Sequence, residues 1–236
     1  MLDLALATAL LEQVAAGRRG PVIRVYRPAS TLAFGRRDSF LPGFARAAAA
    51  AADAGFAPVI RSAGGRAAAY HEQCLVIDEI VPARDAMADV DTRFAAEAES
   101  QAQALRGLGI DARVGEVPGE YCPGRFSVNA RGQTKLIGAA QRIISGAWLF
   151  STVVVVDGAA PVRAVLEDVY AALELDWDPA SVGSVADELP GATVEQVRAA
   201  LLAPLQTRYG LAPGHLTGAD RAAAGEVLAR HRVTSS

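Results

Sequence analysis

One cysteine and one lysine in this sequence could together perform nucleophilic chemistry. Cys122 lies in the segment Glu-Tyr-Cys-Pro-Gly at residues 120–124, where the proline favours an extended cysteine backbone and Pro-Gly favours a turn. The thiol is therefore expected on a loop. Lys135 is the single lysine beside 22 arginines, and a lysine, unlike an arginine, can lose its proton when it is buried. A thiol beside such an amine can act in acyl transfer as a Cys–Lys nucleophilic dyad.

A hairpin is predicted to bring these two residues together. Residues 126–129 and 134–140 have the composition of strands, and the four residues between them include Gly132, which can adopt a positive φ. Lys135 then lies on the return strand, thirteen residues after Cys122. Because antiparallel strands run back past each other, the lysine is expected near the segment that holds the thiol.

Three further features are candidates for structural or binding roles. Cys74 begins an apolar strand and is interpreted as a small buried residue. The loop at 61–66, Arg-Ser-Ala-Gly-Gly-Arg, could let its backbone approach a ligand closely, but it matches no dinucleotide or P-loop pattern. His71 follows that loop, where a lone histidine is more often structural than catalytic. The spacing of histidines, cysteines and carboxylates predicts no metal site.

The elements around these residues predict an α+β fold with a largely antiparallel sheet. Helices are predicted at 2–16, 44–54 and 92–108, and the chain is mainly helical from about residue 161. Beside the hairpin, strands are predicted at 21–26, 31–34, 58–61, 67–70, 74–80, 112–114, 143–144 and 148–156. Strands cluster first and helices gather at the ends of the chain, which favours α+β over a regular βαβ alternation.

The composition excludes several classes of protein. The chain has 236 residues, of which 51% are hydrophobic and 21% charged, so a sizeable core is expected and disorder is not. Its net charge of −3 and lack of a basic run argue against a nucleic-acid partner. No apolar stretch approaches the roughly 18 residues of a membrane span, and the first helix lacks the features of a signal peptide. Two cysteines are too few for a disulfide framework, so a cytoplasmic location is expected.

Two segments, in this order along the chain, form a more specific pattern. Residues 61–71 read Arg-Ser-Ala-Gly-Gly-Arg-Ala-Ala-Ala-Tyr-His, and residues 135–142 read Lys-Leu-Ile-Gly-Ala-Ala-Gln-Arg. They resemble the Arg, Gly-Gly, Ala, His signature and the K-(I/L)-x-G-x-(A/S)-Q-R strand of the biotin/lipoate protein ligase catalytic-domain family, also called the lipoate-protein ligase A/B family. Residues 34–38 are similar to its G-x-x-(D/N/Q) strand-end element. The Tyr-Cys-Pro-Gly segment most resembles the cysteine-dependent octanoyl/lipoyl amidotransferases.

This resemblance implies a single catalytic domain over residues 1–236, with a core at about 22–209 and a fold like the class II synthetases and biotin/lipoate ligases. It implies an octanoyl/lipoyl transferase that moves an acyl group onto a lysine of a lipoyl domain through a Cys122 thioester. Lys135 would hydrogen-bond the acyl carbonyl and shuttle protons. The residues expected to bind substrate are Arg61, Gly64, Gly65, Arg66, His71 and Gly138.

The implied partners are lipoyl-domain proteins, namely the glycine cleavage H protein and the acyltransferase subunits of 2-oxoacid dehydrogenases, with acyl carrier protein as a further candidate donor. No cofactor would be required, because the octanoyl or lipoyl group is the substrate. Two alternatives stay open. One is an ATP-dependent lipoate-protein ligase that forms lipoyl-AMP with ATP and Mg and in which Cys122 is incidental. The other is a non-catalytic binder of lipoyl domains or acyl groups with the same fold.

Overall fold

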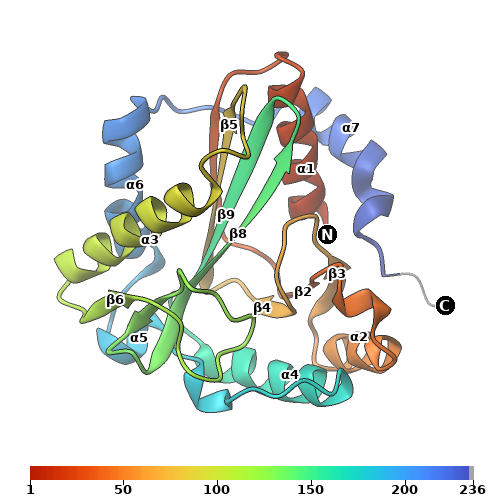
Figure 1. Ribbon diagram of the computed structural model, residues 1–236, viewed down its shortest axis with the longest axis vertical. Coiled ribbons are helices and arrows are strands. Elements are labelled where there is room, and N and C mark those ends of the chain that lie inside the picture. Colours follow the sequence, from red (N-terminus) through yellow and green to blue (C-terminus); the bar gives the residue numbers. More distant parts are fainter. Residues whose placement is uncertain (234–236) are drawn as a thin grey trace.

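The computed structural model describes residues 1–233, and its centre is a six-stranded antiparallel sheet (Figure 1). The strand order is β1-β5-β9-β8-β7-β6, and every neighbouring pair is antiparallel. The long strands β5, β8 and β9 form the middle of the sheet. In sheet order the bounds are β1 Val22–Tyr26, β5 Cys74–Pro82, β9 Ala147–Val155, β8 Thr134–Ile144, β7 Val128–Ala130 and β6 Ala112–Val114.

A second, three-stranded sheet has the order β3-β2-β4. Its strands are β2 Thr31–Phe34, β3 Ala57–Ile60 and β4 Ala68–Tyr70. Helix α2, Phe44–Asp53, crosses between β2 and β3, which are parallel, as expected when a helix carries the chain back to the same end of a sheet. Strand β4 returns antiparallel to β2. The segment between β3 and β4 is the glycine-containing loop at 61–66.

Helices cover the edges and faces of the two sheets. In Figure 1, α3 and α6 lie to the left of the long strands, α1 and α7 to the right, and α2 and α4 at the bottom. Within residues 1–233, no helix is long and apolar enough to cross a membrane. The remaining bounds are α1 Leu2–Ala15, α3 Val90–Gly107, α4 Ala159–Ala172, α5 Val185–Glu188, α6 Val194–Tyr209 and α7 Gly218–Val227, with short 3-10 helices at Asp38–Phe40, Pro179–Ser181 and Leu228–His231.

Two apolar clusters hold these layers together. One joins the small sheet to α2 and α4 through residues such as Phe34, Ala47 and Leu166, and the partly buried Cys122 packs against it. The other joins the large sheet to α3 and α6 through residues such as Leu105 and Leu201. The candidate nucleophile therefore packs against the small-sheet core while its loop joins two strands of the large sheet.

The predicted α+β class is confirmed, and most predicted elements agree with the structure within two residues. The first strand of the hairpin begins at Val128 instead of 126, because the Ser127 N–H donates to the Gly124 carbonyl at 2.9 Å and closes a turn there. The short strand predicted at 143–144 is the end of β8. Within residues 1–233, the parallel pair of β2 and β3 is the part of the two sheets that departs from antiparallel order.

Candidate active site

Cys122 is held on the β6–β7 connection in an unusual backbone conformation. Its φ is 43°, a left-handed value that costs energy for a residue with a side chain. The sequence predicted an extended backbone here, and that prediction is wrong. The Cys122 N–H donates to the Tyr170 hydroxyl at 2.8 Å, and that hydroxyl donates to the Ala67 carbonyl at 3.0 Å. Tyr170, on α4, therefore ties the cysteine loop to the start of β4, and this contact outweighs the local preference.

The Cys122 thiol accepts hydrogen bonds from two groups of the 61–66 loop. The Arg66 backbone N–H lies 3.2 Å from the sulfur, and Arg61 Nη2 lies 3.3 Å from it. Burial of the sulfur opposes ionisation and is the largest single influence. The positive charges of Arg61 and Lys135, with the two hydrogen bonds, outweigh it and lower the pKa of Cys122 below its ordinary value. The structure thus presents a half-buried cysteine whose thiol is favoured in its ionised form.

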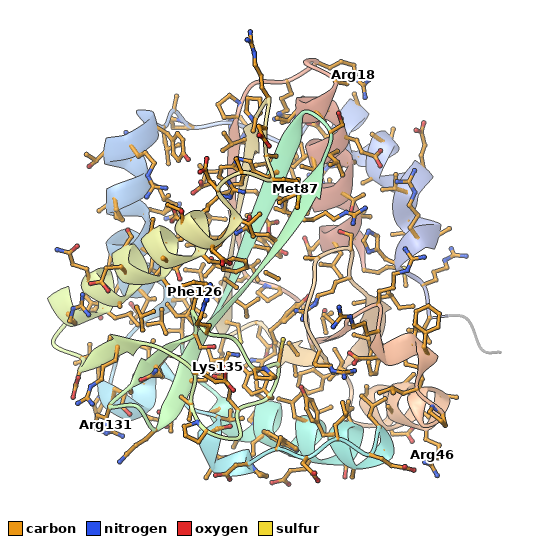
Figure 2. The ribbon with its side chains drawn as sticks, in the orientation of Figure 1. Arg18, Arg46, Met87, Phe126, Arg131 and Lys135 are labelled. Carbon is orange, nitrogen blue, oxygen red and sulfur yellow. The ribbon has the colours of Figure 1, made fainter. Side chains whose placement is uncertain are left out.

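Lys135 reaches the same loop from β8, as the predicted hairpin requires (Figure 2). Gly132 in the turn has a φ of 74°. The Lys135 side chain is 3% exposed, and Nζ donates to the carbonyls of Cys122 at 2.8 Å and Tyr121 at 3.1 Å. Burial lowers the pKa of Lys135, while the charges of Cys122 and Glu120 oppose that shift. The lysine is therefore close to the cysteine, but its hydrogen bonds go to the backbone of the cysteine loop.

The two loop glycines differ in what surrounds them. Gly65 has a φ of 103°, and a Cβ there would lie 2.3 Å from Arg61 Nη2 and 2.7 Å from the Cys122 sulfur. A Cβ at Gly64 would meet no atom within 4 Å. Gly35, at the end of β2, lets the loop approach, because a Cβ there would lie 1.8 Å from the Gly65 carbonyl oxygen. Gly65 is thus closely surrounded beside the thiol, whereas Gly64 faces open space.

An ion pair fixes this loop against the small sheet. Arg66 Nη1 lies 3.0 Å from Oδ1 of the fully buried Asp38, whose Oδ2 accepts the Gly35 N–H at 2.9 Å. Arg61 Nη2 also donates to the Arg66 carbonyl at 2.6 Å. These bonds hold the Arg66 peptide so that its N–H points at the sulfur. The site is therefore preorganised by charged side chains on both sides of the loop.

The remaining expected site residues lie as follows. The His71 ring accepts the Gln73 N–H at Nδ1 and bonds the Gly158 carbonyl through Nε2 at 2.9 Å, and no hydrogen bond joins it to Cys122 or Lys135. Gly138 lies next to the lysine, since a Cβ there would be 3.1 Å from Lys135 Cε. The structure thus places most of the expected residues at the thiol. The exceptions are His71, whose ring bonds stabilise the turn before β5, and Gly64.

Three residues of the site had no role in the sequence interpretation. Glu120 lies two residues before the cysteine and is buried beside Lys135. Its nearness to Cys122 in the sequence was a signal that could have identified it. Asp38 lies in the strand-end element, but its bond to Arg66 depends on the fold. Tyr170 is 48 residues beyond Cys122 in the sequence. The signal for its contact with the Cys122 N–H was a hydroxyl on a helix face that is otherwise apolar.

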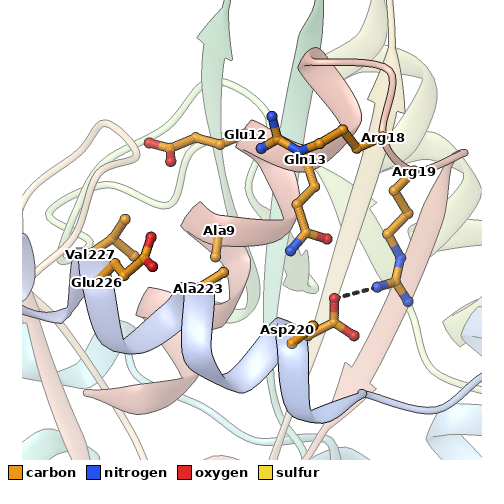
Figure 3. A pocket seen from close by; sticks show the side chains of 10 residues that line it. Ala9, Glu12, Gln13, Arg18, Arg19, Asp220, Ala223, Glu226 and Val227 are labelled. Carbon is orange, nitrogen blue, oxygen red and sulfur yellow. Dashed lines mark hydrogen bonds and ion pairs between the residues drawn. The ribbon is translucent and has the colours of Figure 1, made fainter.

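A pocket of about 400 Å³ lies elsewhere, between α1 and α7 (Figure 3). An ion pair between Arg19 and Asp220 at 2.6 Å crosses one end of it. None of its lining residues belongs to the Cys122 site. Over residues 1–233, no group of three or more histidines, cysteines and carboxylates is arranged to hold a metal ion.

Comparisons with known proteins agree on a family. The family model for the lipoyl protein ligase A/B catalytic domain matches residues 1–206. An octanoyl-[GcvH]:protein N-octanoyltransferase of Anoxybacillus flavithermus is 31% identical over 156 residues, which are 66% of this chain and 56% of that protein. Its counterpart in Geobacillus kaustophilus is 28% identical over 162 residues, 69% of this chain and 57% of that protein. The chain thus spans little more than half the length of these curated relatives.

Solved structures show the same fold. A lipoate-protein ligase A bound with ATP superposes with a TM-score of 0.77 at 23% identity, covering 97% of this chain and 89% of that one. The putative lipoate protein ligase Ta0514 of T. acidophilum with bound lipoic acid gives 0.74 at 22% identity, covering 97% and 90%. The ligase-like fold expected from the sequence is confirmed. With the family model matching most of its length, this chain belongs to the lipoyl protein ligase A/B catalytic-domain family.

Proposed function

We propose that this protein is an acyltransferase of protein lipoylation, which takes an octanoyl or lipoyl group onto Cys122 as a thioester and passes it to a lysine of a lipoyl domain. The observation that carries the proposal is the Cys122 thiol, which Arg61 and the Arg66 N–H favour in its ionised form beside the chain's single lysine. A ligase that activates a carboxylate with ATP has no need of such a thiol. The names of the curated relatives, octanoyl-[GcvH]:protein N-octanoyltransferase, support the same reaction.

In the first step the Cys122 thiolate attacks the carbonyl carbon of an acyl-lysine amide on the donor protein. The new carbon–sulfur bond forms, the carbon–nitrogen bond breaks, and the Lys135 ammonium gives its proton to the leaving amine. The sulfur loses its negative charge as it attacks. The N–H groups of Arg61 and Arg66 that bonded the thiolate then become available to the carbonyl oxygen, where charge develops.

In the second step the neutral lysine amine of the acceptor domain attacks the thioester. A carbon–nitrogen bond forms, the carbon–sulfur bond breaks, and the Cys122 thiolate leaves. The amine's surplus proton passes to the neutral Lys135, which restores the starting protonation states. A guanidinium could not take part in this cycle, because it does not lose its proton in proteins.

The partners follow from this chemistry and from the relatives. We infer that the octanoylated glycine cleavage H protein is the donor, with acyl carrier protein as the alternative, and that lipoyl domains of 2-oxoacid dehydrogenase acyltransferase subunits are acceptors. Arg61, Gly65 and Arg66 would contact the acyl head, and Gly138 leaves room for the lysine. Gly64, which faces open space, would contact the incoming acyl-lysine, and His71 would hold the segment before β5 from outside the reacting atoms. The reaction needs no cofactor, and we place it in the cytoplasm because free thiols persist in a reducing compartment.

Intact-mass spectrometry tests this proposal directly. The protein is mixed with octanoylated H protein, with octanoyl-carrier protein, or with octanoate, ATP and Mg. Without ATP, we expect one octanoyl group on the protein, sensitive to hydroxylamine as a thioester is, followed by transfer to an apo lipoyl domain. Transfer that occurs only with octanoate and ATP would show a ligase, and neither adduct nor turnover with any donor would show a non-catalytic binder.

A further inference from the structure

Glu120 is a buried carboxylate that the acyl-transfer steps do not use. Its Oε1 accepts the Gly124 N–H at 2.8 Å and the Ser127 hydroxyl at 2.7 Å. Its Oε2 is buried and has no hydrogen-bond partner within residues 1–233. A buried charge with an unsatisfied oxygen is costly unless an opposite charge compensates it. A buried carboxylate at this position therefore needs an opposite charge close to it.

Lys135 supplies the compensating charge. Its Nζ lies 3.5 Å from Glu120 Oε1, and the two side chains are 3% and 0% exposed. The other groups that face the ammonium are the Tyr121 ring, with its centroid at 4.9 Å, Cys122 on the same loop, and Arg61 from the end of β3. Burial lowers the pKa of Lys135 most and the charge of Arg61 lowers it further, whereas Cys122 and then Glu120 raise it.

We propose that Glu120 is a positioning residue that acts through Lys135: its carboxylate holds the ammonium against the cysteine loop and keeps it protonated until the leaving amine takes the proton. This inference rests on the proposed function. Once Cys122 is a thioester and Lys135 has given up its proton, the thiolate charge is gone, and among the described residues Glu120 is the acidic group that remains paired with the lysine. Glu120 thus favours the return of the acceptor amine's proton to Lys135, which completes the cycle.

The single lysine of this chain makes the test direct. In protein labelled with ¹³C-lysine, one side-chain signal reports Lys135, and its titration gives the pKa without any need for activity. Glu120→Gln keeps an oxygen for the Gly124 N–H and the Ser127 hydroxyl but removes the charge. Because an opposite charge within about 4–6 Å shifts a pKa by roughly 1–3 units, we expect the pKa of Lys135 to fall by about one unit or more. An unchanged pKa in a folded Glu120→Gln protein would overturn the inference.

Ser127→Ala is the matched control, since it removes one hydrogen bond to the carboxylate and leaves its charge. The pKa of Lys135 should stay close to the wild-type value in this variant, and a fall as large as that of Glu120→Gln would assign the effect to loop structure. Should Glu120→Gln fail to fold, Glu120→Asp can be used instead. It keeps the negative charge, but the side chain is shorter by one methylene and the charge lies farther from Lys135. The pKa of Lys135 should then fall by less than the roughly one unit expected for full loss of the charge, and no fall at all would contradict the inference.

Transfer kinetics give the functional readout. The high-pH limb of the transfer rate should move to lower pH in Glu120→Gln by as much as the pKa of Lys135 falls, so that the rate at a given pH on that limb is reduced about tenfold. A merely structural Glu120 predicts instead an equal loss at every pH and an unmoved lysine titration. If no donor acylates the wild-type protein, the proposed function fails, whereas the lysine titration still decides whether Glu120 controls Lys135.

Discussion

The two cysteines of this protein show opposite behaviour although both thiols are largely surrounded by protein. Cys74 begins β5 and is fully buried, and within residues 1–233 no cation is among the influences on its thiol. Burial raises the pKa of that thiol to about 12, against a weak hydrogen bond from the His71 N–H. Cys122 is partly exposed and lies against Arg61 and Lys135, which with the Arg66 N–H outweigh the cost of burial and lower the pKa of its thiol.

The difference shows that the surroundings decide which thiol can react. Desolvation opposes ionisation at both sites, so burial alone does not distinguish them. What distinguishes Cys122 is that the loop after β3 and the start of β8 each place a cation near its sulfur. Removing these groups one at a time should therefore bring the ionisation and reactivity of Cys122 closer to those of Cys74.

The largest effect is expected from the thiols themselves. Cys122→Ala should reduce acyl transfer by about 10³-fold or more and abolish the thioester adduct, because it removes the thiol on which the thioester forms. Cys74→Ala should keep transfer near the wild-type rate while lowering the free energy of unfolding by about 1 kcal/mol, since it removes a buried sulfur from the core. Peptide mapping of the octanoyl adduct and thermal melts check both. An adduct on Cys74 would reverse the comparison.

Lys135→Arg should cause the next largest loss. It keeps the positive charge but replaces a compact amine that can exchange a proton with a guanidinium that cannot, so we expect transfer to fall by about 10²-fold. Single-turnover rates with a saturating acyl donor measure this. Lys135→Met, which removes the charge as well, should be at least as impaired. Wild-type turnover by Lys135→Arg would show that another group handles the proton.

Arg61→Met should raise the pKa of Cys122 and so make its thiol more like that of Cys74. Loss of the guanidinium raises the pKa of Cys122, so the profile of alkylation by iodoacetamide shifts to higher pH by about one unit, and at pH values below the wild-type pKa the reaction should be about tenfold slower. Arg66→Met keeps the backbone N–H that contacts the sulfur but loses the ion pair with Asp38 that holds the loop, so its profile should shift by less than that of Arg61→Met. Equal profiles for Arg61→Met and the wild type would place the activating charge elsewhere.

The smallest effect is expected from the loop glycines. Gly65→Ala places a Cβ at a φ of 103° and against the Cys122 sulfur and Arg61, so transfer should fall about fivefold, equivalent to about 1 kcal/mol. A Cβ in Gly64→Ala meets no protein atom within 4 Å, so the melting temperature should stay at the wild-type value, and transfer from a protein-borne donor should fall by less than in Gly65→Ala. Comparing kcat/KM for both variants, with melting temperatures as the stability control, separates close approach at Gly65 from a general intolerance of the loop.

Most of the framework of the site could be predicted from local sequence. Hydrophobic periodicity and turn residues act over a few positions, and they were enough to predict the β7–β8 hairpin, with a positive φ at Gly132, and the proximity of Lys135 to the cysteine loop. The apolar neighbours of Cys74 likewise predicted its burial. The motifs at 61–71 and 135–142 indicated the family that the comparisons show.

Local sequence could not predict the conformation and the electrostatics of the thiol. The left-handed backbone of Cys122 contradicts what the following proline favours, because a hydroxyl 48 residues away on α4 accepts its N–H. Likewise, the sequence named Arg61 and the glycine pair as binding residues but could not show that Arg61 contacts the sulfur across 61 positions or that only Gly65 lies against it.

The sequence by itself thus determined which residues could react and which strands carry them, since side-chain chemistry and short-range backbone preferences are properties of neighbouring residues. Only the tertiary structure decided how the Cys122 thiol, which the sequence had already distinguished from Cys74, is favoured in its ionised form. That effect depends on charges carried by the loop after β3 and by β8, and a Coulomb interaction depends on the distance between groups in space, whatever their separation along the chain.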